Sequence, residues 1–381
     1  MTTSSTARPA GATSAPAATV PDPSAEPPLR PVVAQLPGYV AGRRASGALT
    51  AALASNESHY DPLPSVLEEV REAAGRMNRY PDMGAVQLRE RIAAFLGVRP
   101  EEVAVGPGSV GVLQQILGAT CGPGDEVVFA WRSFEAYPIL VSLTGATAVP
   151  VPLAADEGHD LEAMAAAVTD RTRAVLVCSP NNPTGTSVPQ AALERFLAAV
   201  PPHVLVVVDE AYVEFVDEER PLDALALFRA HPNVCVLRTF SKAYGLAGLR
   251  VGYAVAHEGL AEGLRKVALP FGVSTVAQRA AIRSLDAAGE LRERAAAVAA
   301  ERRRVTDALR AAGWELPESQ ANFVWLRAGD ALREALTGAF DRAGVLVRAY
   351  PGDGVRITLA DPATNDRVLA VLADRAAFPA R

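Results

Sequence analysis

Short runs of consecutive apolar residues, separated by segments with helical spacing, constrain the fold of this chain more than any other feature. The runs EVVFA (126–130), AVLVCS (174–179) and VLVVVD (204–209) are apolar almost throughout and do not alternate with polar residues. Strands of this kind are buried on both faces, which is typical of a mostly parallel sheet wrapped by helices. The sequence therefore predicts an α/β fold.

The alternation of strands and helices extends from residue 84 to residue 255. Strands are expected at 102–105, 126–130, 147–152, 174–179, 204–209, 234–238 and 251–255. Helices are expected at 84–96, 109–120, 134–143, 161–168 and 189–200. Upstream of them, LASNESHYDPLP (53–64) is rich in turn formers and predicts a loop, which leads into a helix at 65–77.

The pattern changes after residue 275, where a segment rich in Ala, Arg and Glu begins and an α+β unit is expected. Its helices are expected at 287–312, 331–343 and 362–376, and its strands at 322–326, 345–349 and 355–359. Residues 1–30 are mainly Ala, Pro, Ser and Thr, a composition that predicts a disordered tail without a secretory signal. We therefore expect a tail (1–30), an N-terminal segment that joins the small domain (31–75), a large domain (76–280) and a small domain (281–381).

Composition narrows the classes of function. The net charge of −6 over 381 residues gives no general basic field, which argues against a nucleic-acid partner. No apolar run reaches the length of a membrane span. The five histidines are scattered without HExxH spacing, so no metal site is expected. Cys121, Cys178 and Cys235 lie far apart and are expected to be reduced core thiols of a cytoplasmic protein.

The stretch LRTFSKAYGLAGLRVGY (237–253) carries the strongest chemical signal. Lys242 comes just after a predicted buried strand, at the edge of an α/β sheet where ligands bind. An isolated Ser-Lys pair is usually a surface feature, but a desolvated lysine here can become an amine nucleophile toward a carbonyl. Thr239, Ser241 and Arg250 are suited to a phosphate. An aldehyde that also carries a phosphate indicates pyridoxal 5′-phosphate (PLP).

The segment GPGSVG (106–111) matches the dinucleotide-binding pattern GxGxxG but lacks its structural context. That reading needs an acidic residue at the end of the next strand, whereas Asp125 and Glu126 lie at the beginning of that strand. A dehydrogenase is therefore disfavoured. The backbone amides of Ser109 and Val110, at a helix N-terminus, would still bind an anion such as a phosphate monoester.

Other candidate cofactor contacts follow the ends of predicted strands. Asp209 ends an apolar run and could pair with a protonated ring nitrogen, although it could equally cap the next segment. Tyr212 and Asn182 could donate to a phenolic oxygen, although the loop around Asn182 is also an ordinary turn sequence. Phe134 offers a flat face for a ring, although in isolation it would be a core aromatic.

The chain as a whole resembles the fold type I PLP-dependent aminotransferases. The strings SPNNPTG, DEAY, TFSKAYGLAGLRVGY, NRYPD and VRITL carry the resemblance, which covers roughly residues 36–376. Within this class the chain is similar to the histidinol-phosphate aminotransferase group. The resemblance implies a class II aminotransferase and a homodimer. It also implies a large domain with a mostly parallel seven-stranded sheet between helices, plus a smaller α+β domain.

The resemblance also assigns roles to single residues. Lys242 would bind the cofactor aldehyde and act as general base, Asp209 would pair with the pyridine nitrogen, and Arg356 would bind the substrate α-carboxylate. The remaining cofactor residues would be Ser109, Val110, Ser241 and Arg250 at the phosphate, Tyr80 reaching it from the neighbouring subunit, Tyr212 and Asn182 at the phenolic oxygen, and Phe134 against the ring.

Departures from the histidinol-phosphate pattern bear on the substrate. GSVGVLQQ lacks an acidic residue, and WRSFEAYP stands where those enzymes carry a PPTY-like segment. These strings resemble actinobacterial aromatic amino acid aminotransferases. The expected reaction is transamination of phenylalanine, tyrosine or tryptophan with a 2-oxo acid such as 2-oxoglutarate, and histidinol phosphate is the alternative substrate. Candidate pocket residues are Tyr39, Asn322, Phe323 and Trp325, besides Asn182.

Overall fold

The computed structural model describes residues 29–36, 38, 51–219 and 221–380. The chain divides into two units. The first, Met1–Gln35, contains one described element, the short helix α1 (Pro31–Gln35). The second, Leu36–Arg381, contains the elements described below and the predicted site residues that lie in described parts of the chain.

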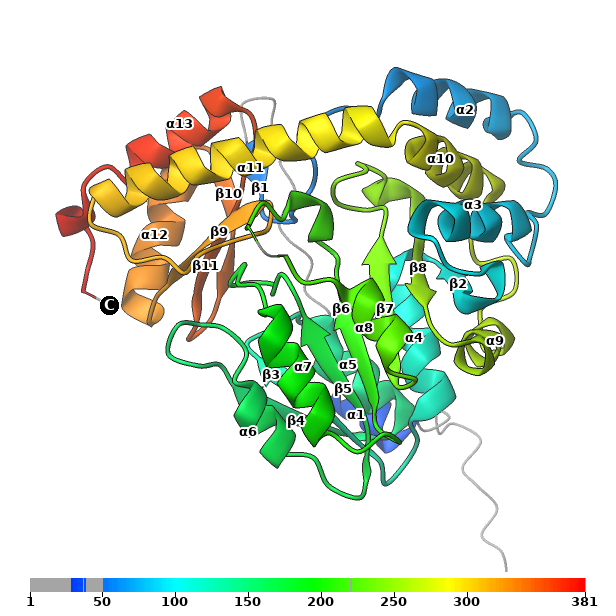
Figure 1. Ribbon diagram of the computed structural model, residues 1–381. Helices are drawn as coiled ribbons and strands as arrows, with labels where there is room; N and C mark the ends of the chain where they lie inside the picture. Colours follow the sequence, from blue (N-terminus) through cyan, green and yellow to red (C-terminus); the bar gives the residue numbers. More distant parts are fainter. Residues whose placement is uncertain (1–28, 37, 39–50, 220, 381) are drawn as a thin grey trace, which may run out of the picture. The chain divides into compact units, whose positions relative to one another are not determined.

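A seven-stranded, mostly parallel sheet forms the larger part of the second unit (Figure 1). Its strand order is β2-β8-β7-β6-β5-β3-β4, and only β8 runs antiparallel to its two neighbours. The strands are β2 (Val103–Gly106), β3 (Glu126–Trp131), β4 (Thr147–Pro152), β5 (Thr172–Cys178), β6 (Leu205–Asp209), β7 (Val234–Thr239) and β8 (Gly252–Val255). The expected α/β fold with a mostly parallel seven-stranded sheet is confirmed.

Helices cover both faces of this sheet, and successive strand residues contact opposite layers. In β6, Val206 and Val208 belong to one apolar cluster, whereas Leu205 and Val207 belong to the other. This is why the run is continuously apolar. The first cluster includes α6 (Leu161–Ala166), α7 (Gln190–Ala199) and α8 (Ala224–Ala230). The second includes α4 (Gly108–Thr120), α5 (Ala136–Thr144) and α9 (Glu258–Lys266).

A four-stranded sheet of order β1-β10-β11-β9 forms the other part of this unit. Its last three strands, β9 (Phe323–Arg327), β10 (Val345–Tyr350) and β11 (Gly354–Thr358), are antiparallel. The segment 53–64 was predicted to be loop from its first residue, and this is wrong for Leu53. Leu53 ends β1 (Ala51–Leu53), which pairs in parallel with β10. The sheet packs against α11 (Ala288–Ala311), α12 (Asp330–Arg342) and α13 (Pro362–Val371).

The remaining helices complete the first apolar cluster. They are α2 (Pro64–Ala74), α3 (Val86–Leu96) and α10 (Thr275–Asp286). Four short 3-10 helices lie at Pro100–Glu102, Val213–Phe215, Ala247–Leu249 and Arg375–Ala377. Helices α8, α9 and α10 were not predicted. The helix expected at 362–376 ends at Val371, and the last 3-10 helix begins at Arg375.

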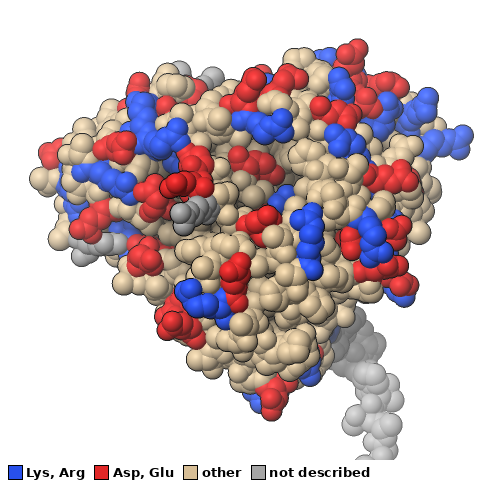
Figure 2. Space-filling view, in the orientation of Figure 1, with Lys and Arg blue, Asp and Glu red and all other residues tan. Residues whose placement is uncertain are grey.

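The surface charge and the helix lengths of the described chain bear on what it can contact. Lys and Arg side chains are interspersed with Asp and Glu on the face shown in Figure 2. None of the described helices is long and apolar enough to span a bilayer.

Candidate active site

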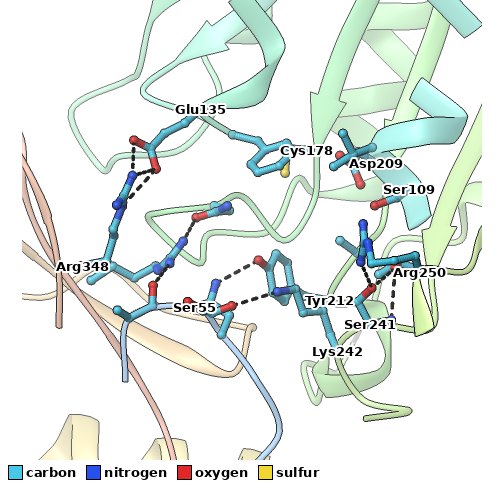
Figure 3. Close-up of a pocket in the computed structure, with 18 residues that line it drawn as sticks. Ser55, Ser109, Glu135, Cys178, Asp209, Tyr212, Ser241, Lys242, Arg250 and Arg348 are labelled. Atoms are coloured by element: carbon cyan, nitrogen blue, oxygen red, sulfur yellow. Dashed lines mark hydrogen bonds and ion pairs between the residues drawn. The ribbon is translucent and has the colours of Figure 1, made fainter. Parts of the chain in front are cut away.

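A cavity of about 240 Å³ lies at the carboxyl ends of β5, β6 and β7, where the four-stranded sheet faces the larger one (Figure 3). Polar atoms brought to one edge by parallel strands converge there. The lining residues are Ala54, Ser55, Asn56, Ser109, Val110, Phe134, Glu135, Cys178, Asn182, Asp209, Ala211, Tyr212, Thr239, Ser241, Lys242, Arg250, Arg348 and Arg356. Most of the site residues expected from the sequence are therefore brought together.

Lys242 lies three residues beyond the end of β7 and extends into this cavity. Its Nζ donates to the Ser55 carbonyl oxygen at 3.1 Å and lies 5.8 Å from the centre of the Tyr212 ring. Burial, together with the positive charge of Arg356, lowers the pKa of the Lys242 amine to about 7. Near neutral pH a large fraction of this amine is therefore unprotonated and nucleophilic.

Asp209 is the last residue of β6, and its carboxyl group is buried at the back of the cavity. The Tyr137 hydroxyl donates to Oδ2 at 2.7 Å, whereas Oδ1 accepts no hydrogen bond from any residue that the structure describes. Burial raises the pKa of Asp209 to about 6, and the Tyr137 hydrogen bond opposes the rise. One carboxylate oxygen is therefore oriented and ready for a cationic N–H donor.

The N-terminus of α4 and the chain around Arg250 form an anion-binding pocket. Gly108 has φ +77°, and a Cβ atom there would lie 2.4 Å from Arg250 Nη2. A Cβ at Gly252 would lie 2.5 Å from the Ser109 backbone nitrogen. Arg250 Nη1 donates to Ser241 Oγ at 3.4 Å. Glycine at these two positions lets a guanidinium, a helix N-terminus and a hydroxyl approach closely, which suits a phosphate monoester.

Tyr212 and Asn182 are both buried and line the same cavity as Lys242. Asn56 Nδ2 donates to the Tyr212 hydroxyl at 2.9 Å, which leaves the hydroxyl proton free to point at a ligand. Asn182 Oδ1 accepts a short hydrogen bond from Arg356. These contacts hold two neutral polar groups in the wall of the cavity that Lys242 enters.

Arg356 lies on β11 and is buried in the cavity wall. Its Nη2 donates to the Ala54 carbonyl oxygen at 2.7 Å, and its Nε has no hydrogen-bond partner among the described residues. The neighbours that fix this guanidinium are neutral, so its positive charge remains available to a substrate anion.

The sequence analysis missed several residues that shape the cavity. Tyr137 and Asn56 fix the two groups described above, and Ser55 binds the lysine amine. Glu135 and Arg348 form an ion pair on the cavity wall, with Nη2 2.8 Å from Oε2. Tyr137 and Glu135 fall within the segment AWRSFEAYP, where only the aromatic at Phe134 was considered. Both residues lie within three positions of Phe134, and this proximity was the signal by which the sequence could have indicated them.

Five predicted residues lie elsewhere or cannot be placed. Tyr80 does not line the cavity of its own chain; its side chain is 81% exposed and stacks on Phe271, with ring centroids 4.6 Å apart. Asn322 does not line the cavity either, because it lies behind Asn56 and donates to its carbonyl oxygen at 3.2 Å. Phe323 and Trp325 are buried behind the wall. Tyr39 falls outside the described residues.

Known proteins resemble this chain over most of its length. The family described as aminotransferase class I and II matches residues 51–372. The aromatic amino acid aminotransferase of Streptomyces coelicolor is 55% identical over 347 residues, which cover 91% of this chain and 96% of that protein. The Rhodococcus jostii protein of the same name is 57% identical over 335 residues, which cover 88% and 92%. The crystal structure of histidinol-phosphate aminotransferase from Sinorhizobium meliloti in complex with PLP has a TM-score of 0.83 at 32% identity, covering 92% and 98%.

Proposed function

Because the chain belongs to the class I and II aminotransferases, we propose that it transfers the amino group of aromatic amino acids to a 2-oxo acid with PLP as cofactor. The aromatic amino acid aminotransferases cited above support this substrate class, since each covers about nine tenths of the chain at more than half identity. The observation that carries the proposal is the position of Lys242. Its amine, with a lowered pKa, shares one cavity with the buried Asp209 carboxylate and the anion pocket at Ser109.

The residues of the cavity fit PLP. Asp209 Oδ1, without a partner among the described residues, suits the protonated ring nitrogen. The pocket formed by Ser109, Ser241 and Arg250 would hold the phosphate, with Val110 beside it. Tyr212 and Asn182 would donate to the phenolic oxygen, and Phe134 would lie against the ring. Bound PLP supplies a ring that withdraws electrons from the substrate Cα.

The protein's own groups would then bind the substrate and move its proton. Arg356 binds the α-carboxylate with two parallel N–H donors and so fixes the orientation of Cα. Lys242 Nζ would take the Cα proton as general base and, as general acid, would deliver it to the carbon that comes from the cofactor aldehyde, not back to Cα. Asp209 keeps a negative charge opposite the ring nitrogen, where negative charge from Cα accumulates. Binding of the carboxylate by Arg356 also disfavours the rival reaction, decarboxylation. In that reaction the bond between Cα and the carboxylate breaks, and the carboxylate does not need to be held.

The pH dependence of cofactor uptake tests the state of Lys242. Only the neutral amine attacks an aldehyde, so uptake by cofactor-free protein should become faster as pH rises through about 7. With a pKa of about 7, the rate should increase about tenfold between about pH 6 and pH 8 and then level off. The measurement is stopped-flow visible absorbance after mixing with PLP, and pyridoxal without the phosphate controls for phosphate ionisation. A rate that still climbs toward pH 10 would indicate an ordinary, solvated lysine.

A substrate panel tests the reaction. The purified holo-protein should convert phenylalanine, tyrosine and tryptophan with 2-oxoglutarate by ping-pong kinetics, with kcat/KM for phenylalanine exceeding that for histidinol phosphate. Product pyridoxamine phosphate after a half-reaction would distinguish transamination from loss of CO2. A higher kcat/KM for histidinol phosphate would replace the proposed substrate by the one that the Sinorhizobium meliloti neighbour is named for.

We also propose a homodimer in which Tyr80 reaches the partner's phosphate pocket. Most of the large apolar side chains that are exposed among the described residues come from two segments, 77–86 and 267–271, which contact each other where Tyr80 stacks on Phe271. An apolar patch of this kind is typical of an interface. The division into a large domain (76–280) and a small domain (281–381), and a cytoplasmic location, remain part of this proposal; the two buried free thiols, Cys178 and Cys235, support the location.

A further inference from the structure

An ion pair faces the cavity at the end farthest from Asp209 (Figure 3). Arg348 Nη2 lies 2.9 Å from Glu135 Oε1 and 2.8 Å from Oε2, and Nε lies 3.2 Å from Oε2. The Arg348 side chain is 11% exposed and that of Glu135 26%. Two nitrogens of one guanidinium therefore bind both oxygens of one carboxylate in a largely desolvated place, where such a contact is strong and specific.

The position of this pair relates it to the substrate side chain. Arg348 and Arg356 are direct partners across β10 and β11, so both side chains project from the same face of the sheet into the cavity. Arg356 would hold the α-carboxylate, and the cofactor would extend from Lys242 toward Asp209. The substrate side chain must then lie near Arg348 and Glu135, at the remaining end of the cavity.

Charge decides what this end of the cavity accepts. A guanidinium without a counter-ion would attract an acidic side chain and would be costly to cover with an aromatic ring. The Glu135 carboxylate neutralises Arg348 and repels a second anion at the same place. Glu135 directly precedes α5, but its side chain makes no capping hydrogen bond to the first turn of that helix. Its described partner is Arg348.

We propose that Glu135 is a specificity-determining residue, which makes the side-chain end of the cavity neutral by binding Arg348 and so favours aromatic over acidic side chains. This inference rests on the proposed function. It also implies that the carboxylate of an acidic acceptor such as 2-oxoglutarate competes with Glu135 for the Arg348 guanidinium.

The test compares a neutral and an acidic substrate in the holo-enzyme. For Glu135→Gln, the ratio of kcat/KM for phenylalanine to kcat/KM for glutamate should fall by about tenfold or more, and KM for 2-oxoglutarate should fall. In Glu135→Gln/Arg348→Gln, most of this shift should disappear, because the guanidinium whose charge Glu135 balances is gone.

A second ion pair gives a matched control for a purely structural role. Arg132 and Asp353 also join the segment after β3 to the β10–β11 hairpin, and their side chains are 19% and 35% exposed, but they do not line the cavity. Asp353→Asn should change kcat/KM for both substrates by the same factor. An unchanged ratio in Glu135→Gln would overturn the inference. The proposed function fails separately, if the wild-type enzyme does not transaminate phenylalanine at all.

Discussion

Replacing Lys242 with alanine should lower kcat for phenylalanine by at least about 10⁴-fold, because one side chain provides both the group that binds the cofactor aldehyde and the base at Cα. The cavity offers no substitute in its described part, since the other lining cations are the guanidiniums of Arg250, Arg348 and Arg356. An arginine stays protonated and cannot act as that base. The measurement is single-turnover kinetics together with the visible spectrum of the purified protein.

The result of this test is easy to interpret, because the chain contains only two lysines, Lys242 and Lys266. Lys266 is an exposed residue of α9 that pairs with Glu262, so Lys266→Ala is the matched control and should retain activity and colour. Borohydride reduction of the holo-protein should label a single peptide, the one containing Lys242. A label on Lys266, or a yellow and active Lys242→Ala protein, would contradict the assignment.

The large sheet could be predicted from the sequence because its strands are buried on both faces and therefore read as continuous apolar runs. Strand β1 could not, since its three residues Ala51–Leu53 carry no pattern and owe their conformation to pairing with β10. Helix α10 did offer a signal that was overlooked. Ser274 accepts a hydrogen bond from the Ala277 amide, the N-cap arrangement that a serine before a helical segment indicates.

The residues of the candidate site also divide into those that the sequence could predict and those that it could not. Asp209 ends a predicted strand, and Lys242 and Asn182 lie within four residues of the ends of two others, so the topology of a parallel sheet already places them at one edge. Asn56, Tyr137 and Glu135 depend instead on partners 156, 72 and 213 residues away. No local pattern specifies such contacts, and only the folded chain reveals that these side chains hold Tyr212, Asp209 and Arg348.

Removing the charge of Asp209 should be the second most damaging change. Asp209→Ala should lower kcat by about 10²–10³-fold, because the protein then lacks the anion that faces developing charge, yet some PLP should still bind through Lys242 and the phosphate pocket. Asp209→Asn keeps the shape and can still accept the Tyr137 hydrogen bond, so it isolates the loss of charge. Near-normal kcat in both variants would show that the ring nitrogen is not the partner of Asp209.

The same carboxylate gives a stability test that does not depend on turnover. Burial raises the pKa of Asp209 to about 6 in the protein without cofactor. The contribution of this group to stability is therefore fully present below about pH 4 and is lost as pH rises through about 6. Above that range the buried carboxylate is charged and only partly satisfied, and asparagine cannot ionise. Cofactor-free Asp209→Asn should therefore have a higher Tm than wild type at pH 8, and a smaller Tm increase when PLP binds. The opposite order of Tm would mean that protein groups already balance the charge of Asp209, so that no cationic ring is needed beside it.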